Sequence, residues 1–157
     1  MAQHIVSRVK VGDSTITLVD IKKSINQVLK DNFSDVKLYA EEVKEGFAKP
    51  SFFTQIIPIY SNHDTTNYSS NKLMIVINYF SKNETELENL KMVDELKKAF
   101  GMTLKVGSRY LTLQNIEADT TDGVLQFKFD LNFFDGVETT KEEGYEAAGE
   151  LKINLKE

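Results

Sequence analysis

The residue types that carry most enzyme chemistry are scarce in this sequence. Its 157 residues include two histidines, His4 and His63, and no cysteine. Without cysteine the chain has no thiolate metal ligand, no cysteine nucleophile and no disulfide. The two histidines lie far apart, neither has HExxH spacing around it, and no GxSxG motif supplies an activated serine. We therefore expect surface histidines, no metal site and no nucleophilic catalysis.

Carboxylates and glycines form no reactive pattern either. Glu41 and Glu42 are adjacent, as are Glu142 and Glu143, so in an extended chain the members of each pair point to opposite faces. General acid–base catalysis requires two carboxyl groups that converge on one substrate from different environments. The glycines form neither GxGxxG nor a P-loop. The sequence therefore predicts a protein without enzymatic activity and without a cofactor.

The charge balance disfavours two kinds of partner. A net charge of −5 is unsuited to a nucleic-acid binder, which needs surplus Lys and Arg, and to an anionic membrane surface. Ten Phe and six Tyr stack bases only where basic residues are interleaved with them. No window reaches the ~20 apolar residues that span a bilayer, and residues 1–13 hold no signal-peptide stretch. We expect a soluble, unexported protein without a specific nucleic-acid or membrane partner.

Two segments have the periodicity of amphipathic helices. The first is predicted to begin at an N-cap, Thr17, with Asp20 in its first turn, and to end near Asn32. The second is predicted to begin at an Asn83 cap and to end at Gly101 in left-handed backbone. The predicted apolar side of the first comprises Leu18, Ile21, Ile25, Val28 and Leu29. That of the second comprises Leu87, Leu90, Val93, Leu96 and Phe100, widened by Met92 and Ala99.

Strands are predicted through most of the remaining chain. They cover residues 36–40, 51–60, 73–80, 103–106, 110–117 and 124–134. The strand at 73–80 is apolar on both faces, which is typical of a central strand covered on both sides. Pro58 cannot donate to a ladder, so its strand lies at an edge or frays there. The polar residues 61–71 are predicted to form a hairpin loop, and Asp122-Gly123 to form a tight hairpin turn.

The last of these strands alternates most clearly, with one apolar and one polar face. The apolar residues are Leu125, Phe127, Phe129, Leu131 and Phe133. The sequence therefore predicts one α+β domain with a single, mostly antiparallel sheet and two α-helices packed on one face. Its predicted parts are an N-terminal arm at 1–13, the α+β domain at 14–135 and an acidic C-terminal extension at 136–157. In that extension, alternating Leu151, Ile153 and Leu155 predict a terminal strand.

Residues 36–53 carry the most specific pattern in the sequence. Extended residues ending in Tyr39 precede a charged turn with Gly46-Phe47, and Pro50 then leads into Phe52-Phe53. This pattern resembles the tail terminator family of phages, of defective prophages in Gram-positive bacteria and of phage-tail-like bacteriocins. The order of helices, loop and strands agrees with that family over about residues 18–134.

The resemblance implies a structural subunit of a tail. Such a subunit forms a ring, typically a hexamer, that stacks on the last ring of the tail tube at the head-proximal end. It stops tube polymerisation, offers a docking surface for a neck or head, and anchors the sheath if the tail is contractile. The expected partners are copies of itself, the tube protein, a sheath protein and a neck or connector protein. Assembly would take place in the cytoplasm of the bacterial host, in a virion or a headless particle.

Three residues are candidate contacts with other subunits. Gly46-Phe47 and Pro50 place an aromatic side chain on a rigid turn, and Tyr68 lies in the long polar segment. Aromatic residues on loops dominate contact energies, so Phe47, Pro50 and Tyr68 are the predicted interface residues. Instead of contacting another subunit, the Phe47 side chain could fold back under the sheet of its own subunit. The terminal arms likewise either add strands to neighbouring subunits or pair within their own sheet.

Two other classes of function fit the sequence. One is a monomeric protein-binding module or tail assembly chaperone that uses residues 61–71. The other is a small hydrolase with an unrecognised site. Self-association and binding to tail tubes separate the first from a ring-forming subunit, because a chaperone has no need of either. Hydrolysis that is lost on mutation of one carboxylate would identify the second.

Overall fold

The computed structural model describes residues 6–9, 15–41, 46–136 and 139–142, and its main body is a six-stranded sheet. The strand order is β2-β3-β4-β7-β6-β5. The strands are β2 (Lys37–Tyr39), β3 (Ser51–His63), β4 (Tyr68–Phe80), β7 (Val124–Gly136), β6 (Arg109–Thr121) and β5 (Thr103–Val106). Only β2 and β3 pair in parallel; the other pairs are antiparallel. The predicted mostly antiparallel α+β sheet is confirmed.

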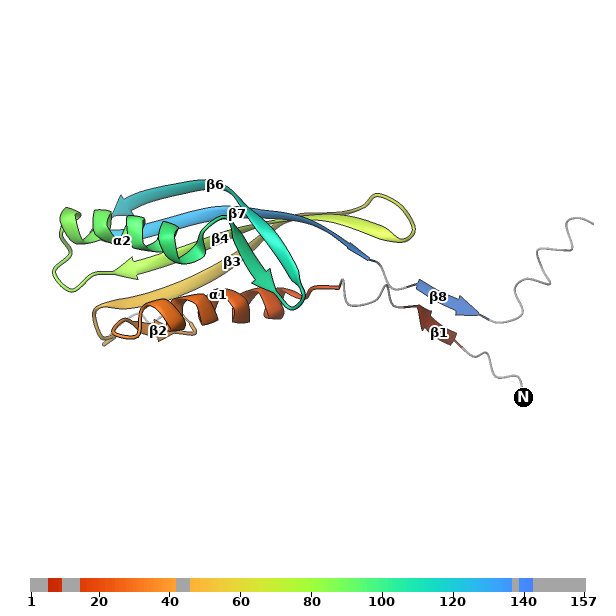
Figure 1. The fold of residues 1–157 in the computed structure, drawn as a ribbon, viewed down its shortest axis with the longest axis horizontal. Coiled ribbons are helices and arrows are strands. Elements are labelled where there is room, and N and C mark those ends of the chain that lie inside the picture. Colours follow the sequence, from red (N-terminus) through yellow and green to blue (C-terminus); the bar gives the residue numbers. More distant parts are fainter. Residues whose placement is uncertain (1–5, 10–14, 42–45, 137–138, 143–157) are drawn as a thin grey trace, which may run out of the picture.

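Two helices, α1 (Leu18–Asn32) and α2 (Glu86–Phe100), lie on one face of this sheet (Figure 1). The core forms between them and the inward faces of β4 and β7, where period-two alternation collects apolar side chains. The aromatic rings of Phe100 and Phe129 lie 5.4 Å apart, and those of Phe127 and Phe129 lie 6.2 Å apart. All five residues of the predicted apolar face of β7 are buried, as expected: Leu125, Phe127, Phe129, Leu131 and Phe133.

Helix α1 begins and ends as its sequence predicts. Thr17 is the N-cap, and Thr17 and Asp20 bond reciprocally to each other's main-chain N–H groups in a capping box. The buried residues are Ile21, Ile25 and Leu29. Leu18 is an exception, because 46% of it is exposed at the first position of the helix.

Helix α2 differs from the prediction in its cap and in the side that it buries. The N-cap is Thr85, not Asn83; Asn83 instead donates to the carboxylate of Glu88. Leu87 and Leu90 were expected in the core, but they are 61% and 56% exposed. The residues that face the core are Asn89, Met92, Leu96 and Phe100. The helix is rotated because the Asn89 side chain donates to the main-chain oxygen of Gly123, in the β6–β7 turn.

The predicted polar loop at 61–71 is wrong, because both strands continue through most of it. β3 extends to His63 and β4 begins at Tyr68, so only residues 64–67 form the turn. Backbone pairing continues in register from Tyr60–Lys72 to His63–Ser69. Main-chain hydrogen bonds hold a ladder whatever the side chains are, so polar residues on both faces leave no alternation from which to predict a strand.

β4 is the central strand that its sequence predicts, since it lies between β3 and β7. The described helices cover only one of its faces. On the other face Val76 is still only 4% exposed, and it is flanked in register by Gln55 and Lys128. We call this helix-free side the open face of the sheet. Neither described helix has the length and apolarity needed to span a membrane.

A second, two-stranded sheet joins the two ends of the chain. β1 (Val6–Val9) pairs antiparallel with β8 (Thr139–Glu142), beyond the end of β7 (Figure 1). The described part of the N-terminal arm therefore pairs with the C-terminal extension rather than with the main sheet. The terminal strand predicted around residues 151–155 lies outside the described residues, as do His4 and residues 42–45.

Candidate assembly surfaces

An aromatic patch lies on the open face at the far end of the β3–β4 hairpin. We define it as Tyr60, Tyr68 and Phe134, which are 45%, 50% and 67% exposed. Tyr68 pairs with Gly136 in the β4–β7 ladder, so Tyr68 and Phe134 are diagonal neighbours across the two strands. Residues in that relation lie close enough for aromatic side chains to touch. Exposed aromatic side chains on one face are suited to contact a partner.

The opposite face of the same hairpin has a groove of about 400 Å³. Asp135 fixes one wall of it by accepting hydrogen bonds from the main-chain N–H of Ile16 (3.2 Å) and from Arg109 (3.4 Å). Arg109 also donates to the main-chain oxygen of Phe134 at 2.7 Å. The start of α1, β6 and β7 are thereby joined beneath the hairpin, which holds the aromatic patch on a supported strand end.

Phe47 and Pro50 lie at the other end of the sheet. The Phe47 ring packs against Phe80 of β4 at 4.7 Å and against Tyr39 at 6.4 Å, on the open face. The Tyr39 hydroxyl accepts a hydrogen bond from the main-chain N–H of Ala48 (2.8 Å), which fixes this turn. Phe47 is half-buried. Its side chain therefore folds back onto its own sheet, which is the second of the two positions predicted for it. Pro50 is half-buried as well and follows a cis peptide bond.

The three predicted interface residues are therefore not brought together. Tyr68 begins β4 and Phe80 ends it, thirteen residues that span about 40 Å in an extended strand. Phe47 packs on Phe80, so Phe47 and Tyr68 mark opposite ends of the sheet. His63, the described one of the two histidines, is an exposed residue at the end of β3. Within the described ranges, no group of three or more His, Asp or Glu side chains is placed to hold a metal ion.

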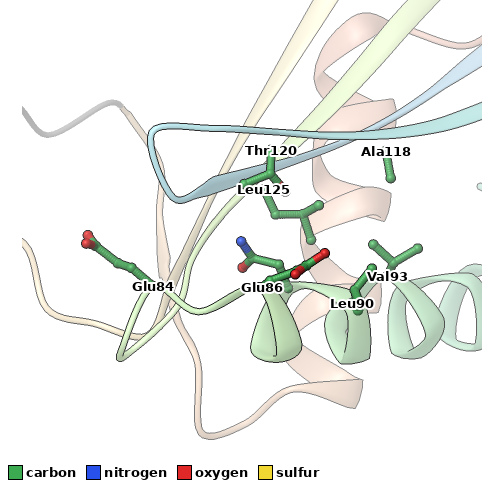
Figure 2. Close-up of a pocket in the computed structure, with 8 residues that line it drawn as sticks. Glu84, Glu86, Leu90, Val93, Ala118, Thr120 and Leu125 are labelled. Atoms are coloured by element: carbon green, nitrogen blue, oxygen red, sulfur yellow. The ribbon is translucent and has the colours of Figure 1, made fainter.

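A second groove, of about 440 Å³, lies between α2 and the strands β6 and β7 (Figure 2). Val93 rises from α2 toward Ala118 of β6, and the buried Leu125 of β7 forms part of the lining. Glu86 and Leu90 line it from the helix side. We call this the α2–β6 groove. Asn89 and Thr120 add polar groups to its mostly apolar middle, and it is acidic at the end where α2 begins.

β3 and β6, which lie next to the short edge strands β2 and β5, each leave part of their outer side unpaired within the described residues. β2 covers β3 only from Ser51 to Phe53, and beyond it Lys22 of α1 donates to the main-chain oxygen of Thr54. Pro58 then lies on the free stretch, next to a register shift, which confirms its predicted edge position. A proline and a bulge protect an edge from unwanted pairing.

The titratable groups with shifted pKa values serve the fold. Hydrogen bonds from Thr17 hold the pKa of Asp20 below its ordinary value. Partial desolvation raises the pKa of Glu88, but hydrogen bonds from Thr85 and Asn83 outweigh it and the net shift is downward. Burial lowers the pKa of Lys22 and raises that of Tyr79. All four shifts occur where helices are capped or packed, not in either groove.

These features define an α+β protein whose conspicuous surfaces are aromatic patches, an apolar groove and free strand edges. A family model described as "Phage tail terminator protein" matches residues 20–144. The chain belongs to this phage tail terminator family, as the resemblance of residues 36–53 indicated. It is accordingly a structural protein of the phage tail that interacts with other tail components. A search of curated proteins found no match.

Several surface residues were not foreseen from the sequence, although one had a usable signal. Phe134 follows the buried Phe133, so strand periodicity already placed it on the polar face with Asn132. Tyr60 could not be assigned to a face, because a bulge after Pro58 shifts the register. The exposure of Leu90 had no signal, since its spacing from Leu87 and Val93 fits a buried stripe.

Proposed function

We propose that this protein is a ring-forming tail terminator, a homohexamer that caps the head-proximal end of the tail tube. The cap stops tube polymerisation and presents a docking surface to a neck or connector protein. If the tail is contractile, the same ring anchors the sheath; if the particle is headless, it closes a bacteriocin-like tail. Assembly takes place in the host cytoplasm. The match of residues 20–144 to the tail terminator family carries this proposal.

The distribution of surfaces supports a head-to-tail ring. Such a ring needs two different, complementary patches on each subunit, one for each neighbour. The α2–β6 groove is the candidate for one of them, whereas the aromatic patch lies at the other end of the molecule and is available to another tail component. Leu90 lines the groove with 56% of its area exposed, which leaves apolar surface for a partner to cover.

The predicted contact residues divide between two interfaces in this proposal. Tyr68 belongs to the aromatic patch and contacts a neighbouring tail component through its half-exposed ring. Phe47 and Pro50 shape the opposite end of the open face, where Lys49 forms an ion pair with Glu84. Rigid aromatic side chains lose little conformational entropy on binding, which makes them effective anchors. The proposed role is structural throughout and includes no catalytic step.

Electron microscopy of tails assembled with and without the protein tests the proposal. In its absence we expect tubes of unregulated length, and on its addition tubes that end in a ring. Negative-stain images give both the length distribution and the presence of a cap. An unchanged length distribution, with no density at tube ends when the protein is present, would refute the capping role.

A further inference from the structure

The α2–β6 groove borders a strand edge that lacks a partner. β5 pairs with β6 from Arg109 to Thr112, and no described strand pairs with the outer edge of β6 over residues 114–121. On the helix side of this stretch, Ala118 and Thr120 line the groove. On the open face lie the exposed carboxylates of Glu117 and Asp119. A strand added here would point alternate side chains into an apolar groove and beside two acids.

Residues 151–156 of the same sequence have the matching alternation. Leu151, Ile153 and Leu155 fall on one side of an extended chain, and Lys152 and Lys156 fall on the other. The apolar side suits Leu90, Val93 and Ala118. The two cations suit Glu117 and Asp119, although Asp119 also pairs with Lys128 of its own sheet at 3.2 Å. Opposite charges across neighbouring strands stabilise their pairing.

The segment cannot reach the groove of its own chain. Ala118 pairs with Phe127, and Gly136 is nine residues further along β7, about 30 Å away. β8 lies beyond that end and leads away from the sheet (Figure 1), which adds about 10 Å for its four residues. From Glu142 to Leu151 there are nine residues, which reach at most about 32 Å when fully extended. The gap of roughly 40 Å therefore exceeds the reach of the chain.

We infer that residues 151–156 of one copy add as a strand to β6 around Ala118 and Thr120 in a neighbouring copy. The new strand pairs with the free main-chain groups of β6, and its apolar side chains fill the α2–β6 groove. Backbone pairing supplies affinity in such strand addition, and the side-chain pockets supply specificity. The inference rests on the proposed ring, because it names a contact that joins adjacent subunits. The occupant of the groove is thus a second copy of this chain.

Cysteine crosslinking between two singly substituted proteins tests this contact, because the chain has no cysteine of its own. Full-length Thr120→Cys and Ile153→Cys proteins are mixed and oxidised under assembly conditions. Crosslinked dimers that contain one of each are expected, since facing residues of adjacent strands meet disulfide geometry. The matched control replaces Ile153→Cys with Asn154→Cys, whose side chain points to the opposite face. Loss of the mixed dimer is expected with this control.

Three results would overturn the inference: no mixed dimer with Ile153→Cys, an equal yield with Asn154→Cys, or a crosslink confined to single chains of the double variant. A Thr120→Cys thiol that is labelled as fast in capped tubes as in the isolated subunit would also overturn it, because the groove would then be empty. Capping of tubes is measured separately. Capped tubes without the crosslink refute strand addition alone, and the crosslink without caps refutes the proposed function alone.

A pair of substitutions on α2 tests the groove itself. Leu90→Glu places a charge in the groove, whereas Leu87→Glu changes a similarly exposed leucine that does not line it. Loss of the mixed Thr120–Ile153 dimer is expected only with Leu90→Glu. Equal yields from both variants would contradict insertion into the groove. Circular dichroism of each variant verifies that the fold is kept.

Discussion

Tyr68 is half exposed at the first position of β4, where its main-chain oxygen accepts hydrogen bonds from Asp64 and Thr65 and closes the hairpin turn. Its side chain is not needed for those bonds, so function and stability can be separated at this residue. We expect Tyr68→Ala to leave the free energy of unfolding within about 0.5 kcal/mol of the wild-type value. It should nevertheless weaken binding to tail tubes.

Leu87→Ala is the control for this prediction. Leu87 is 61% exposed and lies near the start of α2, which contacts the β6–β7 turn at the other end of the sheet from the aromatic patch. Co-sedimentation with purified tubes measures binding, and urea unfolding measures stability. If the two variants bound tubes equally well, Tyr68 would not be a contact residue.

Two capping carboxylates make the stability of the fold sensitive to acid. The folded-state pKa values of Asp20 and Glu88 lie below their ordinary values of 3.8 and 4.5. Groups with depressed pKa values stabilise the folded state above their unfolded pKa and lose that contribution as pH falls through the folded pKa. We expect the free energy of unfolding to fall as pH drops through the folded-state pKa values of Asp20 and Glu88. The fall should be less steep in the Asp20→Asn/Glu88→Gln double variant. Urea titrations between about pH 6 and about pH 3 measure it.

Glu95→Gln is the control, because Glu95 is an exposed residue of α2 that does not take part in the cap. This variant should keep the wild-type pH dependence. A double variant whose profile matched that of the wild type would show that the caps do not set the acid response.

At the scale of elements, the orientation of α2 decides which leucines hold the fold. Leu96 is fully buried, whereas Leu90 is 56% exposed. Leu96→Ala is expected to destabilise the protein by about 2–5 kcal/mol, because it removes packed methyl groups and leaves a cavity. Leu90→Ala should cost about 0.5 kcal/mol or less in the isolated subunit. Urea unfolding of the two variants gives the comparison, and similar losses would contradict the orientation of the helix.

The β6–β7 turn is held by backbone conformation and by contact with the start of α2. Gly123 has φ +79°, and a Cβ placed there would lie 3.2 Å from the Cβ of Glu84. Gly107 has φ +62° with open space around it. Gly107→Ala should therefore cost about 1–2 kcal/mol from backbone strain alone. Gly123→Ala should cost more, as measured by thermal unfolding; an equal loss would mean that Glu84 moves aside freely.

At the scale of the whole molecule, a cap and a chaperone differ in how the number of copies bound to a tube depends on its length. A ring that caps tubes binds only at their ends, so the number of copies bound per tube should be independent of tube length. A protein that binds along the wall should load in proportion to length. Quantitative gels of sedimented tubes, fractionated by length, measure this ratio. Binding that grows with tube length would contradict the proposed cap.

The sequence alone determined the elements whose signals are local. Thr17 and Asp20 define a cap within one turn, and Asp122-Gly123 defines a turn by its positive φ angles. Alternation in β7 settled which of its faces is buried. The pattern around Gly46-Phe47 and Pro50 indicated the family, because it combines turn chemistry with the order of elements.

Only the tertiary structure decided the features that depend on contacts between distant residues. Asn89 reaches Gly123 and so turns α2 away from the stripe that its own spacing favours. The pairing of residues 60–63 with 69–72 turns a polar segment into strand through main-chain bonds. Likewise, β6 has a free edge because β5 begins only at Thr103, opposite Thr112. Local periodicity records which side chains are apolar, whereas their burial depends on what the rest of the chain places against them.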